Sequence, residues 1–159
     1  MTKSEYSPAR LVALLRERGL TLAAAESCTG GWFAKRMVDA PGASAVFFGG
    51  VVSYTNEIKE KILSVARATL DAHTAVSAPV AAEMAEGVRR KFGSDIGVSV
   101  TGLAGPGGGT KEIPLGRVFI GIATSEGTEV LTLTLPGTRR EVRFAAVKEM
   151  TAALINRLL

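Results

Sequence analysis

The sequence is poor in the residues that metal, redox and disulfide chemistry require. Cysteine occurs once, as Cys28, and histidine occurs once, as His73. One thiol cannot form an internal disulfide bond, and one cysteine with one histidine cannot build a Cys/His metal site. We therefore expect a protein without a metal ion or other cofactor that works in a reducing cytoplasm.

Long apolar runs, aromatic residues and dense positive charge are also scarce. No apolar run approaches the roughly 20 residues of a membrane-spanning helix, and the N-terminus lacks the apolar core of a secretory signal. Aromatic residues make up 6% of the chain, the net charge is +4, and the longest basic run is Arg89-Arg90-Lys91. Strong nucleic-acid binding combines aromatic platforms with a basic groove. We therefore expect no strong nucleic-acid binding, no membrane binding, and a weak preference for anionic ligands.

What the chain does contain is an alternation of helix and strand patterns. Its 159 residues, 47% of them apolar, suffice for one good core, so we predict a single domain over residues 1–159. Periodicity, capping residues and stop residues predict helices over 7–19, 29–42, 56–65, 77–93 and 138–159. Apolar runs predict strands over 20–26, 45–55, 95–102, 116–124 and 128–135, the last two as a hairpin. This order predicts an α/β domain with a mixed sheet under helices, and a polar connection around His73.

The stretch AAESCTGG at residues 24–31 is the first candidate site. Ser27 follows an apolar strand and precedes a helix, and a side chain at such a turn lies at the sheet edge where α/β proteins bind ligands. The backbone N–H groups of Thr29, Gly30 and Gly31 are expected to converge there and to hold an oxyanion or a phosphate. Ser27 or Thr29 is also a candidate helix cap. Cys28 is either a small buried apolar residue or a rival nucleophile.

A serine nucleophile needs a base, and the sequence offers two kinds. His73 lies in the predicted polar connection with only Asp71 as a nearby acid, so a serine–histidine–acid triad depends on one poorly placed residue. A lysine whose pKa is lowered by burial can instead accept the serine proton near neutral pH. Lys59 is the first candidate and Lys61 the second, because residues two apart on a helix cannot both face the site. A solvated helix face is the alternative for both lysines.

A glycine-rich loop, TGLAGPGGGT at residues 101–110, follows a predicted strand and is a candidate anion-binding loop. Its GGGTK order inverts the Gly-Lys-Ser/Thr order of a P-loop, and the third glycine of the dinucleotide fingerprint is missing. The loop is therefore no sign of ATP or NAD. A tight turn or a mobile flap is the structural alternative. Thr101 is expected to face the same edge as Ser27.

Arginines gather at the start of the last predicted helix, in GTRREVR. Arg139 and Arg143 are one turn apart and share a face, whereas Arg140 points elsewhere. Positive charge at a helix N-terminus opposes the helix dipole, which favours an anionic ligand near these arginines over a solvated face.

Four motifs occur together in the order and spacing of one family: AESCTGG from Ala25, YTNEIK from Tyr54, TGLAGPGGG from Thr101 and PLGRV from Pro114. With them the chain resembles, from about Leu11 to its end, the C-terminal domain of the competence/damage-inducible CinA proteins. That family includes stand-alone nicotinamide-nucleotide amidases. The resemblance implies a three-layer sandwich in which helices flank a mixed sheet. It also implies the stand-alone form, without the N-terminal domain of longer members.

The same resemblance implies an activity: hydrolysis of the carboxamide of nicotinamide mononucleotide to nicotinate mononucleotide and ammonia, by a serine–lysine mechanism without a metal. Ser27 is then the nucleophile and Lys59 the base, with Tyr54 orienting one of them. Thr101 relays a proton or contacts the substrate. The substrate-binding positions are Thr29, Gly30, Gly31, Gly102, Gly105, Gly107 and Arg139, with Arg139 meeting the anionic part. We further expect a homo-oligomer, a dimer or higher.

Two departures from the family pattern lie in the glycine-rich loop. Glycine stands where an acidic residue is common, and Ile113 stands where a lysine is common before the proline. We expect these changes to affect ligand affinity more than chemistry. Two other function classes stay open: a non-catalytic nucleotide-binding or interaction module of the competence/damage-inducible type, and a cysteine hydrolase that uses Cys28.

Overall fold

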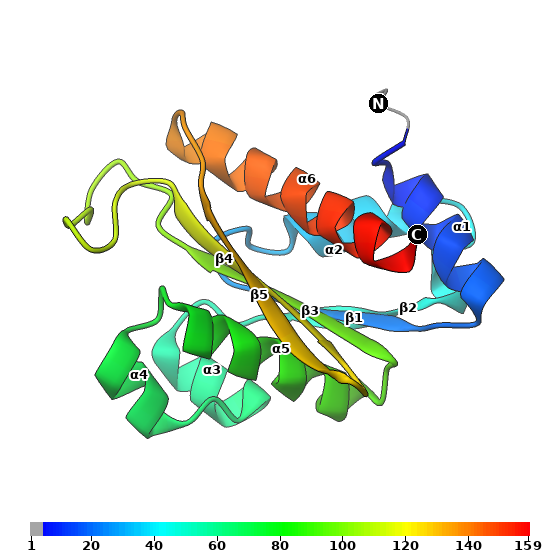
Figure 1. The fold of residues 1–159 in the computed structure, drawn as a ribbon, viewed down its shortest axis with the longest axis horizontal. Coiled ribbons are helices and arrows are strands. Elements are labelled where there is room, and N and C mark those ends of the chain that lie inside the picture. Colours follow the sequence, from blue (N-terminus) through cyan, green and yellow to red (C-terminus); the bar gives the residue numbers. More distant parts are fainter. Residues whose placement is uncertain (1–4) are drawn as a thin grey trace.

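The computed structural model describes residues 5–159 and contains one five-stranded sheet between two helical layers (Figure 1). The helices are α1 (Pro8–Arg18), α2 (Trp32–Val38), α3 (Asn56–Leu63), α4 (Arg67–His73), α5 (Ala78–Phe92) and α6 (Arg139–Leu158), with a 3-10 turn at Ala43–Ala45. The strands are β1 (Leu22–Glu26), β2 (Phe47–Val52), β3 (Ile96–Gly102), β4 (Arg117–Thr124) and β5 (Gly127–Thr134). The predicted α/β class is confirmed.

The sheet is mixed, as predicted, with the strand order β2-β1-β3-β4-β5. Strand β1 lies parallel to β2 and to β3, whereas β3–β4 and β4–β5 are antiparallel, the latter as the predicted hairpin. The parallel part therefore brings the carboxyl ends of three strands to one edge, where ligand sites of α/β sheets occur.

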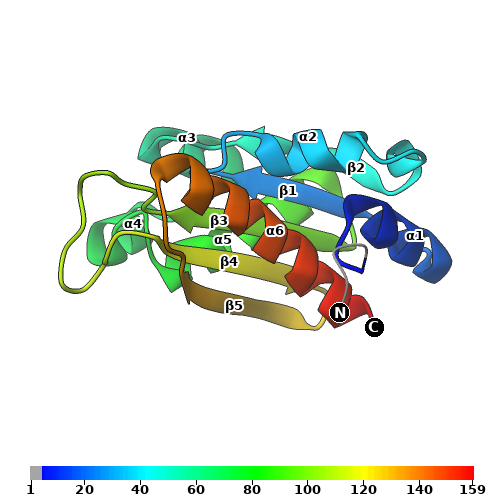
Figure 2. The same cartoon turned by 90° about the horizontal axis from the view of Figure 1, so that it is seen from above.

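Helices cover both faces of this sheet and give the three-layer sandwich. Figure 1 shows α1, α2 and α6 on one face and α3, α4 and α5 on the other, and the view from above shows α6 running across the sheet beside α2 (Figure 2). Strand β1 is buried on both sides, which explains its small apolar residues. Its Leu22 and Ala24 join the apolar cluster under α1, α2 and α6, and its Ala23 and Ala25 join the cluster under α5.

Local sequence signals explain where most helices begin and end. Ser7 and Ser77 accept hydrogen bonds from the first turns of α1 and α5, and Gly19 and Gly93 end these helices in the left-handed conformation. A capping box between Thr138 and Glu141 begins α6. The Glu141 carboxylate lies in the first turn, so it offsets part of the arginine charge at that positive helix end.

Two predictions of local structure are wrong. The polar connection around His73 is the short helix α4, which has no side-chain cap at Ala66. Glu83 of α5 organises it instead, by accepting hydrogen bonds from the Ala66 N–H and the Thr69 hydroxyl. Helix α2 begins at Trp32 rather than Thr29, because the two preceding glycines have φ angles of 61° and 94° and form a turn.

Candidate active site

The carboxyl ends of β1, β2 and β3 assemble the candidate active site. The Ser27 N–H donates to the Val100 carbonyl at 3.1 Å, which continues the pairing of β1 with β3 by one residue. The Ser53 N–H donates to the Glu26 carbonyl at 2.8 Å, which does the same for β1 and β2. The first residue after β1 therefore lies between the ends of its two neighbours, where α3 also begins.

Lys59 of α3 contacts the Ser27 hydroxyl directly. Its Nζ lies 2.9 Å from Ser27 Oγ, 2.6 Å from the Ser53 carbonyl oxygen and 3.3 Å from the Tyr54 carbonyl oxygen. These three oxygens can satisfy the hydrogen bonds of the Lys59 amine in both its protonated and its neutral form. An ammonium donates to all three, whereas a neutral amine donates its two hydrogens to the carbonyls and accepts the serine proton with its lone pair. The contact can therefore carry a proton from serine to lysine.

Burial makes the neutral form of this lysine accessible. Lys59 is 1% exposed although its neighbour Lys61 is exposed on the same helix. Loss of hydration disfavours the ammonium and lowers the pKa of Lys59 from its usual 10.5 to about 8. A base in this range is suited to work near neutral pH.

The thiol next to the nucleophile has the opposite character. Cys28 is 7% exposed, and burial raises the pKa of its thiol from 9.0 to about 11. A thiol with this pKa holds its proton near neutral pH, so the thiolate that a cysteine hydrolase needs is scarce. The structure therefore argues against the cysteine hydrolase and favours the interpretation of Cys28 as a small apolar residue.

A buried carboxylate that the sequence analysis overlooked occupies the start of α2. Glu26 is 1% exposed and accepts hydrogen bonds from the N–H groups of Gly31, Phe33 and Ala34 at 3.2, 3.0 and 2.8 Å. It also accepts one from the Thr29 hydroxyl. A carboxylate at a positive helix end is favourable. Its position as the last residue of an apolar strand, five residues before Gly31, was the available signal.

Residues 27–31, which we call the nucleophile turn, offer fewer free N–H donors than predicted, in part because Glu26 binds one of them. The N–H groups of Thr29, Gly30 and Gly31 were expected to be free, but the Gly31 N–H binds Glu26 and the Gly30 N–H binds the Ser27 carbonyl at 3.1 Å. Within residues 5–159, the N–H groups of Cys28 and Thr29 donate to no other residue, although the Cys28 N–H lies against its own thiol. These two are therefore the donors available to a ligand at this turn.

Arg139 links two of the predicted site elements. Its guanidinium donates to the Gly105 carbonyl at 2.8 Å and to the Tyr54 hydroxyl at 3.1 Å. Across the part of the chain that the structure describes, it forms no salt bridge. Its positive charge is therefore not neutralised by a carboxylate, and Tyr54 beside it is 59% exposed. This pair presents a cation and a hydroxyl group to solvent near the α3 and loop side of the site.

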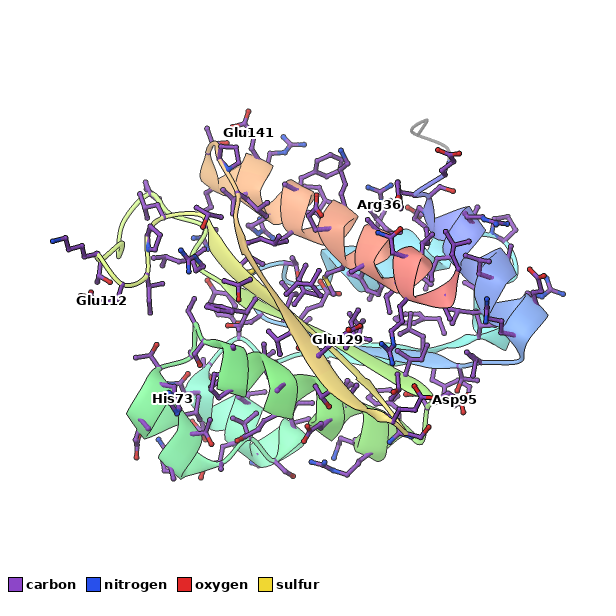
Figure 3. The ribbon with its side chains drawn as sticks, viewed as in Figure 1. Arg36, His73, Asp95, Glu112, Glu129 and Glu141 are labelled. Atoms are coloured by element: carbon purple, nitrogen blue, oxygen red, sulfur yellow. The ribbon has the colours of Figure 1, made fainter. Side chains whose placement is uncertain are left out.

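Thr101 and the glycines follow the predicted strand end but differ in their contacts. The Thr101 hydroxyl is buried and donates to the Ala75 carbonyl at 2.7 Å, so its proton is directed away from Ser27 in this structure. Gly102 has no room for a side chain, since a Cβ there would lie 2.8 Å from Val118. Gly107 lies exposed in the glycine-rich loop, and the connection between β3 and β4 that continues from this loop projects beyond the sheet at Glu112 (Figure 3).

The other candidate base lies elsewhere. His73 ends α4 in the lower helical layer, is exposed, and forms no hydrogen bond with Ser27 in the described chain (Figure 3).

A large cavity lined by Arg18, Arg89, Asp95 and Arg157 lies at the opposite end of the sheet. Because α1, α5 and α6 all end there, their negative ends account for the arginines, and we assign the cavity no role in the chemistry. No group of three or more metal-ligating side chains occurs in residues 5–159.

Comparison with known proteins identifies the family of the chain. The CinA C-terminal domain family matches residues 5–158. The chain belongs to this family. A competence-damage inducible relative from Caldanaerobacter subterraneus subsp. tengcongensis is 56% identical over 133 residues, which are 84% of this chain and 32% of that protein. A CinA-like protein of Geotalea uraniireducens is 49% identical over 84% of this chain and 32% of its own length. The chain thus spans about a third of these CinA relatives.

Solved CinA structures share the whole fold. A CinA superfamily protein from Klebsiella pneumoniae superposes with a TM-score of 0.93 at 32% identity, over 99% of this chain and 98% of that one. A competence/damage-inducible protein from Agrobacterium tumefaciens gives 0.91 at 36% identity, over 96% and 93%. No helix in residues 5–159 is long and apolar enough to cross a membrane.

Proposed function

We propose that this CinA-family chain is an amidohydrolase that converts nicotinamide mononucleotide and water to nicotinate mononucleotide and ammonia. The observation that carries the proposal is the 2.9 Å contact between Ser27 Oγ and the Nζ of a buried lysine, Lys59, whose pKa is lowered to about 8. A nucleophile within hydrogen-bond distance of a base poised near neutral pH is the arrangement that serine-type acyl transfer needs.

The reaction follows from this pair in two halves. In the first, Ser27 Oγ attacks the carboxamide carbon while its proton passes to Lys59 Nζ, and collapse of the tetrahedral adduct expels ammonia with that proton. In the second, Lys59 Nζ takes a proton from water while the water oxygen attacks the ester carbon. Collapse of this adduct breaks the bond to Ser27 Oγ, Lys59 gives the proton to that oxygen, and nicotinate mononucleotide leaves. The carbonyls of Ser53 and Tyr54 hold the amine so that its lone pair points at the serine. Each half needs donors for the negative oxygen, and the N–H groups of Cys28 and Thr29, which donate to no other residue within 5–159, supply them.

Arg139 supports an anionic substrate. A phosphate on the ribose of the mononucleotide can bind a guanidinium and a tyrosine hydroxyl, which Arg139 and Tyr54 present together 3.1 Å apart. The Gly105 carbonyl fixes the same guanidinium to the glycine-rich loop. Binding energy from the phosphate then positions the amide for attack without taking part in the chemistry.

The direct test measures ammonia release from nicotinamide mononucleotide by the purified protein. Ser27→Ala should abolish release, and Lys59→Ala should lower it by at least about 100-fold, the contribution of a general base. Lys61→Ala is the matched control, because this lysine is exposed on the same helix and should leave the rate nearly unchanged. Undiminished release by Ser27→Ala would exclude the serine mechanism.

The second candidate is a non-catalytic nucleotide-binding or interaction module; its competence/damage-inducible type is the one that the relatives' names state. It predicts tight binding of the mononucleotide by calorimetry without ammonia release. We also propose a cytoplasmic homo-oligomer that binds neither nucleic acid strongly nor membranes. Light scattering and a DNA-binding titration test these expectations.

A further inference from the structure

Arg143 of α6 holds the nucleophile turn from outside. Its Nε donates to the Cys28 carbonyl at 2.7 Å, and its Nη2 donates to the Thr29 carbonyl at 3.3 Å. The guanidinium carbon lies 5.6 Å from the centre of the Trp32 ring, at the start of α2. The salt bridges of residues 5–159 do not include Arg143. A full positive charge, unpaired by any carboxylate there, is thus directed at two backbone carbonyls.

Gly30 leaves the space that this contact needs. Its φ angle is 61°, and a Cβ at this position would lie 3.3 Å from Arg143 Nη2. A larger side chain would therefore press on the guanidinium as well as strain the turn. Although Arg143 is 116 residues from Ser27 in sequence, it fits closely against the turn.

Because the peptide bond is planar, the contact of Arg143 with the Cys28 carbonyl also fixes the direction of the Thr29 N–H. The Cys28 carbonyl and the Thr29 N–H belong to one peptide unit, in which the two groups point in opposite directions. Holding the carbonyl toward Arg143 consequently turns the Thr29 N–H away from it. A cation on the carbonyl also polarises the peptide and strengthens its N–H as a donor. The Thr29 N–H has no acceptor among residues 5–159.

We propose that Arg143 is a positioning residue for the amidase reaction, on which this inference rests. It fixes and polarises the Cys28–Thr29 peptide so that the Thr29 N–H stabilises the oxyanion formed when Ser27 attacks. Arg143 itself touches neither the substrate nor the reacting atoms. Its contribution belongs to the transition state, because the negative oxygen exists only after attack.

The test compares Arg143→Gln and Arg143→Lys with Arg140→Gln, an exposed arginine of the same helix turn whose loss serves as the control. Two rates are measured for each protein: turnover of nicotinamide mononucleotide, and phosphonylation of Ser27 by a fluorophosphonate probe, followed by mass spectrometry. The probe also develops charge on an oxygen beside the serine, but it needs no natural substrate.

Arg143→Gln should lower kcat by about 10- to 100-fold, somewhat less than complete loss of an oxyanion donor. KM should stay within about threefold, since the ground-state amide does not depend on this donor. Phosphonylation of Ser27 in Arg143→Gln should slow by a similar factor. Arg143→Lys keeps the charge but loses the planar set of guanidinium donors, so its kcat and phosphonylation rate should lie between those of the wild type and Arg143→Gln. For Arg143→Ala, low millimolar guanidinium should restore part of the labelling rate.

Equal phosphonylation rates in Arg143→Gln and Arg140→Gln would overturn the proposal. So would a change confined to KM, or a loss of labelling in Arg143→Lys that merely follows a lower melting temperature. If the wild-type protein is labelled at Ser27 but releases no ammonia, the proposed substrate is wrong, and the labelling rates alone decide the role of Arg143. Absence of labelling in the wild type overturns both proposals.

Discussion

The charge state of Lys59 gives the sharpest prediction. At pH 7 a lysine with a pKa of about 8 is neutral in about one molecule in ten, whereas an unperturbed lysine near 10.4 is neutral in about one in 2,500. Burial therefore makes the base about 200 times more available at that pH. The value of kcat/KM should rise about tenfold between pH 6 and pH 7 and level off above about pH 9, with one pKa near 8.

Replacement of Lys59 by arginine separates the base from its charge. A guanidinium keeps the positive charge but stays protonated, so Lys59→Arg should be as damaging as Lys59→Ala, a loss of at least about 100-fold. The assay is ammonia release from nicotinamide mononucleotide between pH 5.5 and 10.5, with Lys61→Ala measured beside it. Near-normal turnover by Lys59→Arg, or a rate that keeps rising through pH 10, would refute the reasoning. His73 would then be the next base to test.

Four further results are expected from the same site. Cys28→Ala should keep most of the activity. Alkylation of Cys28 at pH 8 should be slow because its thiol has a pKa of about 11, and fast alkylation would contradict this raised pKa. Activity should survive exhaustive treatment with EDTA, and a loss that zinc or magnesium restores would show a metal that we do not expect. Free nicotinamide should be a very poor substrate. Arg139→Gln should lower kcat/KM for the mononucleotide by about 10- to 100-fold, which is the contribution of a charge-assisted hydrogen bond. Equal turnover of nicotinamide and its mononucleotide would contradict the proposed phosphate site. Between pH 8 and about 10.4 the unfolded chain holds the Lys59 proton and the folded chain does not. The free energy of unfolding of the wild type, measured with urea, should therefore rise by about 1.4 kcal/mol per pH unit relative to that of Lys59→Met. A difference between the two proteins that stays constant with pH argues against the shifted pKa.

The helical caps and strands were accessible from sequence because their causes are local. Ser7, Ser77 and Thr138 each bind N–H groups three residues ahead, and the apolar run of β1 has no alternative to burial on both sides. Helix α4 was missed because its organiser, Glu83, lies 14 residues beyond Thr69 on another helix. A pattern of neighbouring residues contains no sign of such a contact.

The same distinction divides the candidate site. The sequence alone determined which residue types were available: one thiol, one imidazole, a serine after an apolar strand, and two lysines on one short helix. The family motif already placed Lys59 before Lys61, but only the tertiary structure gives the physical difference between them: Lys59 is buried and Lys61 exposed, and the desolvation that lowers a lysine pKa comes from residues packed around it. It also assigned the N–H groups of the nucleophile turn, since a helix start can bind either a ligand or a buried carboxylate, and Glu26 already fills that position. Arg143 reaches the turn only because α6 crosses the sheet beside α2, a packing relation that no local pattern encodes.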